Sequence, residues 1–264
     1  MIAGVDAYGT LSGAALCLAG RRFACRYISG DNPLSMAEAR DLTSHGIGIV
    51  SLYEVSPIEA LGGEQAGALA GRAALLGAEL GTGRIRMPRG SVVIFAADFD
   101  VQQSDRDAVL LYWREAGNAI RDAGLLAGAY GPQSIVEAAV VFGWVPIGMV
   151  AAGWRSAPKI SPRIQLVQTV QQIEIGGVTC DQDIATTTHF GAWNLAGLWP
   201  PAQEEGVEMR IAHSSAGAAF VVSGSRKMPV DGAHWPAIAA QQLPAVEMDD
   251  AELALLDEVA WGAL

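Results

Sequence analysis

Two aspartates follow a run of apolar residues in the stretch SVVIFAADFD, residues 91–100. The apolar run Val92–Phe95 is typical of a strand that is buried on both faces. Asp98 and Asp100 are separated by one residue, and strand side chains at i and i+2 point to the same side. Neighbouring carboxyl groups raise each other's pKa. Such a pair at the carboxyl end of a parallel strand is suited to general acid and general base catalysis.

Other polar and aromatic residues follow the apolar runs that we expect to form strands. Besides the aspartate pair they are Asp6 and Tyr8, Arg26 and Tyr27, Tyr53 and Glu54, Tyr130, Trp154, Gln168, and Asp181 and Asp183. Four of the five tyrosines of the chain are among them. If the strands form one barrel, these side chains converge on one face of it.

This mixture of carboxyl groups and aromatic rings points to carbohydrate chemistry. Carboxyl groups supply the acid and the base for cleavage of a glycosidic bond, and flat rings bury the apolar faces of sugars. The candidate catalytic residues are Asp100, Asp98, Asp6, Glu54 and Asp181, and the candidate substrate-binding residues are Arg26, Tyr27, Tyr53, Tyr130, Trp154 and Gln168.

Several of these side chains have a structural alternative. Asp6 and Arg26 would form a buried ion pair between neighbouring strands. Tyr27 and Tyr53 would be core rings with their hydroxyls at the rim. The remaining alternatives are a helix cap for Asp100 and a loop position for Asp183.

Short apolar runs that alternate with amphipathic stretches predict the elements that position these residues. We expect strands at 2–8, 24–28, 46–55, 91–100, 125–131, 145–154, 164–169 and 178–185, and helices at 13–20, 35–45, 63–81, 104–124 and 133–142. The links before the last two strands show no clear helix. This order indicates an α/β fold, a (β/α)8 TIM-type barrel. No GxGxxG or GxxxxGK[ST] motif supports the alternative, an open nucleotide-binding sheet.

The pattern breaks near residue 190. We expect the barrel over 1–190, a linker over 191–206 and a small C-terminal α+β module over 207–264. In this module a hairpin is predicted at 209–213 and 218–222, a further strand at 225–230, and a helix at 251–260 with an apolar stripe. We interpret the module as an attachment domain; the alternative is that its stripe packs on the barrel.

Eight short motifs resemble, in order, the signature of a known family. They are GVDAYG, RYI, SLYE, FAADFD, GAYG, AAGW, LVQT and VTCDQDIA, and the resemblance covers roughly residues 1–185. The family is the glycoside hydrolase-like domain of unknown function found in actinobacterial and phage proteins, related in pattern to family 25 lysozymes. The resemblance implies a TIM barrel that acts on, or binds, cell-wall glycan, with its acidic positions at Asp6, Glu54, Asp98, Asp100 and Asp181.

The resemblance leads to an expected activity, hydrolysis of a β-1,4 bond in peptidoglycan. Asp100 takes the position of the lysozyme glutamate and would be the general acid, while Asp98 or Asp181 would stabilise positive charge or orient water. Tyr27, Tyr130 and Trp154 would form sugar platforms. The main alternative is a non-catalytic wall-binding or structural minor tail protein of a phage, favoured because Asp-x-Asp replaces Asp-x-Glu. A third, an intracellular sugar-processing enzyme, is weakened by the extra module.

Composition and charge bear on partners and location. The net charge of −11 argues against nucleic acid or an anionic membrane as partner. No apolar run reaches the ~20 residues of a membrane-spanning helix. We read no signal peptide in MIAGVDAYG. We therefore expect synthesis in a host cytoplasm and action at the cell wall or in a phage virion. In a virion, residues 207–264 would bind other tail proteins. The histidines show no metal-ligand spacing, and we expect neither metal nor cofactor.

Overall fold

The computed structural model of the chain describes residues 1–77, 79–80, 85–154 and 159–200, and strand segments at 210–213, 219–223, 226–230, 245–247 and 257–258. The chain divides into two compact units, Met1–Pro201 and Ala202–Leu264.

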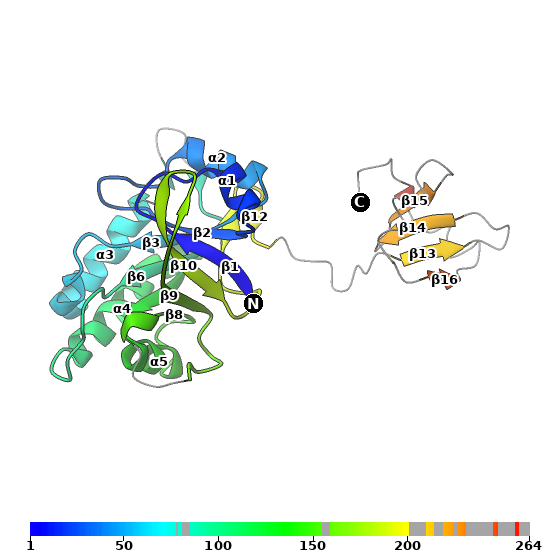
Figure 1. Ribbon diagram of the computed structural model, residues 1–264. Coiled ribbons are helices and arrows are strands. Elements are labelled where there is room, and N and C mark those ends of the chain that lie inside the picture. Colours follow the sequence, from blue (N-terminus) through cyan, green and yellow to red (C-terminus); the bar gives the residue numbers. More distant parts are fainter. Residues whose placement is uncertain are drawn as a thin grey trace. The chain divides into compact units, whose positions relative to one another are not determined.

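Eight strands of the first unit close into a barrel (Figure 1). They are β1 (Ile2–Asp6), β2 (Phe23–Tyr27), β3 (Gly48–Tyr53), β6 (Val92–Ala96), β7 (Leu126–Gly131), β8 (Ile147–Ala151), β9 (Leu166–Ile175) and β10 (Val178–Ala185). Each pairs with the next, β3 pairs with β6, and β10 pairs with β1 to close the ring. This confirms the predicted TIM-type α/β barrel.

Helices lie between the strands and outside the ring (Figure 1). They are α1 (Gly13–Leu18), α2 (Met36–Ser44), α3 (Gly63–Gly77), α4 (Arg106–Ile120) and α5 (Gln133–Val141), with short 3-10 turns η1 (Glu59–Gly62), η3 (Arg121–Ala123) and η4 (Ala152–Trp154). Two short strands, β4 (Glu79–Leu80) and β5 (Ile85–Arg86), form a separate pair after α3. Within the described part of the chain, no helix has both the length and the apolar character needed to cross a membrane.

The last strand of the barrel departs from the parallel pattern. β9 and β10 form an antiparallel hairpin across Gly176 and Gly177, whose positive φ angles of 60° and 82° suit a two-residue turn. β10 is therefore antiparallel to β1 as well, and Asp181 lies opposite Asp6. Our expectation for the eighth strand is corrected accordingly: the amino-terminal half of β10, and not its carboxyl end, reaches the mouth of the barrel.

Strand alternation divides the apolar residues between two cores. The cluster inside the barrel contains Phe23, Cys25, Val50, Leu52, Val92, Ile94, Ile147, Met149, Leu166 and Ala185. The intervening residues, such as Ile49, Val93 and Phe95, pack outward with helix residues such as Trp113 and Ala116. The interior is thus filled mainly with apolar side chains, and most of its polar side chains gather at the carboxyl ends of the parallel strands.

Residues 190–200 close the amino-terminal end of the barrel. The ring of Phe190 lies 5.0 Å from that of Phe23, the first residue of β2. Trp199 covers Gly48, the first residue of β3, so closely that a Cβ at Gly48 would clash with the indole. The short strands β11 (Trp193–Asn194) and β12 (Gly197–Leu198) extend the sheet from β3. The linker predicted from residue 191 is therefore wrong over these residues, because buried aromatic side chains attach them to the barrel.

The described strands of the second unit form one sheet in the order β16-β13-β14-β15-β17. They are β13 (Arg210–His213), β14 (Ala219–Ser223), β15 (Arg226–Val230), β16 (Ala245–Glu247) and β17 (Asp257–Glu258). The predicted hairpin and the following strand are confirmed as β13, β14 and β15. The helix predicted at 251–260 is wrong at β17, which pairs with β15; the rest of that range lies outside the described residues.

Candidate active site

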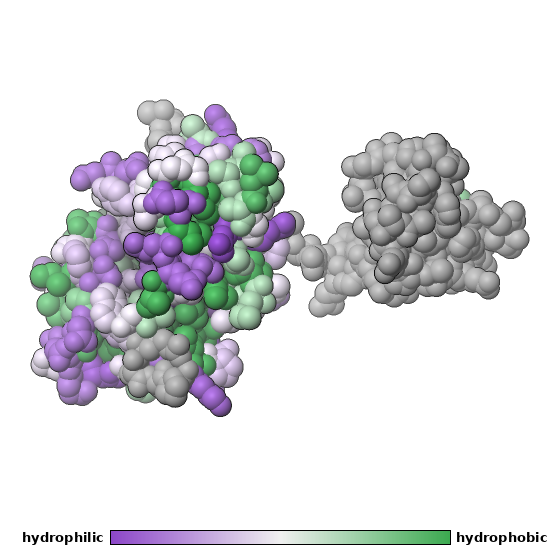
Figure 2. Space-filling view, viewed as in Figure 1, coloured by the Kyte–Doolittle hydropathy of each residue, from purple (hydrophilic) through white to green (hydrophobic). Residues whose placement is uncertain are grey.

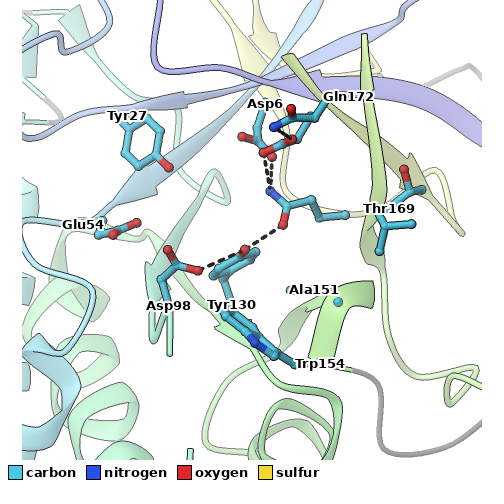
Figure 3. A pocket seen from close by; sticks show the side chains of 13 residues that line it. Asp6, Tyr27, Glu54, Asp98, Tyr130, Ala151, Trp154, Thr169 and Gln172 are labelled. Atoms are coloured by element: carbon cyan, nitrogen blue, oxygen red, sulfur yellow. Dashed lines mark hydrogen bonds between the residues drawn. The ribbon is translucent and has the colours of Figure 1, made fainter. Parts of the chain in front are cut away.

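A pocket of about 510 Å³ opens at the carboxyl ends of the parallel strands (Figure 3). It contains eight of the predicted site residues, namely Asp6, Tyr27, Glu54, Asp98, Tyr130, Trp154, Gln168 and Asp181, together with Ala151, Gly153, Thr169, Val170 and Gln172. Its volume is within the range of small-molecule sites. On the side of the molecule seen in Figure 2, hydrophilic side chains gather near the centre of the first unit, where Figure 1 places β9 and β10.

Strand alternation decides which of two adjacent candidates enters the pocket. Adjacent strand residues point to opposite faces, so Tyr27 lines the pocket and Arg26 does not. In the same way Glu54 lines the pocket, while the buried Tyr53 packs outward with its ring 5.5 Å from that of Phe95. The sugar-binding role predicted for Tyr53 is therefore wrong, and its alternative, a core ring, holds.

Arg26 is a structural residue. Its fully buried guanidinium donates from Nε to Glu38 Oε1 at 2.6 Å, from Nη2 to Glu38 Oε2 at 3.1 Å, and from Nη1 to the Ala7 carbonyl at 2.6 Å. This bidentate ion pair links β2 to α2. We expected Arg26 either to bind substrate or to form an ion pair with Asp6. Both expectations are wrong, because its guanidinium is paired with Glu38.

Asp100 lies outside the pocket. β6 ends at Ala96, and the Asp98 amide donates to the Pro57 carbonyl at 3.1 Å, so the alternation of a strand does not extend to Asp100. Asp100 is exposed, and its Oδ2 accepts a hydrogen bond from Gln102 Nε2 at 2.9 Å. The prediction that both aspartates share one pocket is therefore wrong for Asp100 and right for Asp98.

Asp183 is fully buried inside the barrel, so the expected loop position is wrong. It lies opposite Gly4 of β1, one level below Asp181 and Asp6. Neither of its carboxyl oxygens has a hydrogen-bond partner of normal geometry among the described residues. Burial raises the pKa of Asp183 well above its ordinary value, because a carboxylate charge is unfavourable in the apolar interior.

The Gln168 amide is the centre of a hydrogen-bond network in the pocket (Figure 3). Its Nε2 donates to Asp6 Oδ2 at 2.6 Å and, at the longer distance of 3.5 Å, to Asp181 Oδ2. Its Oε1 accepts a hydrogen bond from the Tyr130 hydroxyl at 2.7 Å, and that hydroxyl lies 3.4 Å from Asp98 Oδ1. Gln172 Nε2 donates to Asp181 Oδ1 at 2.9 Å. Strands β1, β7, β9 and β10 together thus fix the orientation of these groups.

Burial and mutual repulsion raise the carboxyl pKa values in the pocket. Burial raises the pKa of Asp6 to about 7, against the opposing effect of the Gln168 amide. The pKa of Glu54 is raised to about 7 by burial first, then by the charges of Asp98 and Glu59. Burial also raises the pKa of Asp98, while the Tyr130 hydroxyl acts to lower it. At neutral pH Glu54 and Asp6 are therefore protonated for a substantial part of the time.

Glu54 and Asp98 are arranged to act on a ligand. Figure 3 shows both carboxyl groups facing the open centre of the pocket, near the Tyr27 ring. The hydrogen bonds of Glu54 run through its backbone, and no described residue donates to its carboxyl group. Two carboxyl groups of this kind can transfer protons to and from a bound molecule. Within the described ranges, no group of three or more acidic, histidine or cysteine residues is arranged to hold a metal ion.

Three lining residues on β9 were not predicted as site residues. β9 extends to Ile175, six residues beyond the predicted end of that strand, and Thr169, Val170 and Gln172 line the pocket. Val170 and Gln172 follow Gln168 at steps of two, so the alternation of a longer strand would have indicated both.

Fold and site together define a TIM-type barrel with a carboxyl-rich pocket at the carboxyl ends of its parallel strands. The model of the Rv2525c-like, glycoside hydrolase-like domain family matches residues 14–185, more than half of the chain, and the chain belongs to this family. No curated protein sequence matches the chain.

Solved structures share this fold. The Mycobacterium tuberculosis Tat-secreted protein Rv2525c, in complex with L-tartrate, aligns with a TM-score of 0.64 and 23% identity over 72% of this chain and 98% of that chain. Its complex with HEPES aligns equally well, with 24% identity over the same shares. An uncharacterized Bacillus stearothermophilus protein aligns with a TM-score of 0.53 and 17% identity over 70% of this chain and 96% of that chain.

Proposed function

We propose that the barrel hydrolyses a glycosidic bond in a cell-wall glycan, with peptidoglycan as the expected substrate. The observation that carries this proposal is the pair Glu54 and Asp98, two carboxyl groups that face the same open pocket. Their environments differ, because Asp98 is near the Tyr130 hydroxyl and the carboxyl group of Glu54 has no donor among the described residues. Such a difference separates an acid from a base.

In this mechanism Glu54 replaces Asp100 as the general acid. Its pKa of about 7 leaves it protonated for a substantial part of the time at neutral pH, and it donates that proton to the glycosidic oxygen as the bond to the anomeric carbon breaks. The Asp98 carboxylate stabilises the positive charge that develops on the sugar ring and accepts a proton from the attacking water. The water oxygen bonds to the anomeric carbon, so the products are two sugar chains with one water added.

Other pocket residues are suited to hold the sugar. Trp154 and Tyr27 offer aromatic faces to the apolar side of a ring. The Asp6, Gln168 and Asp181 network offers fixed acceptors and donors to sugar hydroxyls. The combination of flat aromatic rings with fixed polar groups is typical of carbohydrate sites, and it supports a glycan over an apolar ligand.

Two observations support a location at the cell wall. The Mycobacterium tuberculosis neighbour is described as Tat-secreted, and secretion brings a protein to the wall. A separate second unit, Ala202–Leu264, offers a means of attachment to the wall or to another chain, such as a tail component of a phage virion. Either attachment would keep the barrel near an insoluble substrate.

A zymogram on purified actinobacterial cell walls tests the proposal. Wild-type protein and an Asp100→Asn control should clear the gel equally, because Asp100 is outside the pocket. Glu54→Gln and Asp98→Asn should each lower the release of reducing sugar at least about 100-fold. Clearing that persists in both variants would overturn the assigned roles.

Glycan binding without cleavage is the second candidate function. It is favoured by the Gln168 amide, which donates hydrogen bonds to the carboxyl groups of both Asp6 and Asp181. Carboxyl groups held in this way are suited to the recognition of a sugar. Wild-type protein that is retained on purified walls and releases no reducing sugar would support this reading over hydrolysis.

A further inference from the structure

A serine from a neighbouring strand end holds the backbone of Glu54. Ser29 Oγ donates to the Glu54 carbonyl oxygen at 2.9 Å and accepts a hydrogen bond from the Glu54 amide at 3.1 Å. One hydroxyl thus uses its donor and one of its acceptor positions on the same residue. This fixes the peptide groups on both sides of the Glu54 Cα, and with them the direction in which its side chain leaves the backbone.

The same turn connects Glu54 to Asp98. Three residues after Glu54, the Pro57 carbonyl accepts the Asp98 amide at 3.1 Å. The backbones of the two candidate catalytic residues therefore belong to one hydrogen-bonded assembly that joins the ends of β2, β3 and β6. A small shift of this turn would change the separation of the two carboxyl groups.

We propose that Ser29 is a positioning residue for Glu54: its hydroxyl fixes the direction in which the Glu54 side chain leaves the backbone towards the pocket. The inference rests on the acid role of Glu54 in the proposed function.

Two measurements on the full-length chain test the proposal, amide hydrogen exchange at Glu54 and glycan hydrolysis kinetics. Ser29→Ala should lower kcat about tenfold with KM within about twofold and should increase amide hydrogen exchange at Glu54. Ser29→Thr keeps the hydroxyl and should restore kcat. Ser44→Ala is the control, because that exposed hydroxyl bonds only within α2 and to its cap residue His45.

Wild-type kcat and wild-type amide exchange in Ser29→Ala would overturn the role of Ser29. If the wild-type protein hydrolyses no glycan, the proposed function fails by itself, and amide hydrogen exchange still decides whether Ser29 holds Glu54.

Discussion

Trp154 is the largest aromatic residue of the pocket, and it is the last residue of η4, the turn that directly follows β8. If it stacks on a sugar, Trp154→Ala should weaken glycan binding about tenfold, or ~1.4 kcal/mol, and change kcat less. Binding is measured by calorimetry with soluble wall oligosaccharides. The matched control is Phe142→Ala, an aromatic side chain that is 62% exposed after α5, at the opposite end of the barrel. Equal losses in both variants would argue against stacking.

Asp183 should make the stability of the protein depend on pH. Its pKa is raised from an ordinary 3.8, so between that value and its folded pKa the folded state binds more protons than the unfolded state. Stability is then greatest below about pH 4 for this group, and falls as pH rises, by at most about 1.4 kcal/mol per pH unit. Asp183→Asn should remove this slope in urea unfolding at pH 5 and pH 8. A slope equal to that of the wild type would refute the prediction, and Asp100→Asn serves as the control.

Of the site residues predicted from the sequence, eight line the pocket and three lie elsewhere. Composition at strand ends was sufficient to find Asp6, Glu54 and Asp98, because parallel strands end at one face. It was insufficient for Arg26 and Tyr53, since the side of the strand on which each residue lies depends on register. Glu38, the partner that takes Arg26, lies on a helix twelve residues away, and no local pattern reveals that pairing.

The segment that closes the amino-terminal end of the barrel should contribute strongly to stability. Trp199 is only 7% exposed and its Nε1 donates to the Gly46 carbonyl at 3.0 Å. Trp199→Ala should lower the free energy of unfolding by roughly 3–5 kcal/mol, measured by urea denaturation. Trp154→Ala removes a side chain of the same size at the pocket and should lower the free energy of unfolding much less. A small effect at Trp199 would mean that residues 190–200 are an extension and not part of the core.

Most barrel elements were predictable from sequence because each is a short apolar run or an amphipathic stretch. The exceptions have physical causes. β6 ends at Ala96, and the Asp98 amide then donates to the Pro57 carbonyl in the turn after β3, a contact distant in sequence. The reversal at Gly176 and Gly177 was readable from the two glycines, but the expectation of a complete eightfold repeat favoured a parallel last strand. The role of residues 190–200 depends on the far end of the barrel, which local periodicity does not describe.

The molecule as a whole consists of two compact units, which suggests separate tasks. We expect a chain shortened to residues 1–201 to keep the thermal stability of the barrel and its hydrolysis of soluble oligosaccharide. It should lose retention on insoluble walls or on a partner chain, measured by co-sedimentation. If the shortened chain keeps its retention and loses only thermal stability, the second unit is a structural cover and the attachment role is wrong.

The central claim is that the pocket adds water across a glycosidic bond through Glu54 and Asp98. It is tested most directly by mass spectrometry of wall glycan digested in oxygen-18 water. Wild-type protein and Asp100→Asn should release oligosaccharides that carry one solvent oxygen at the new reducing end. Glu54→Gln and Asp98→Asn should release almost none. Absence of labelled product from the wild-type protein, or undiminished labelled product from both pocket variants, would contradict the account.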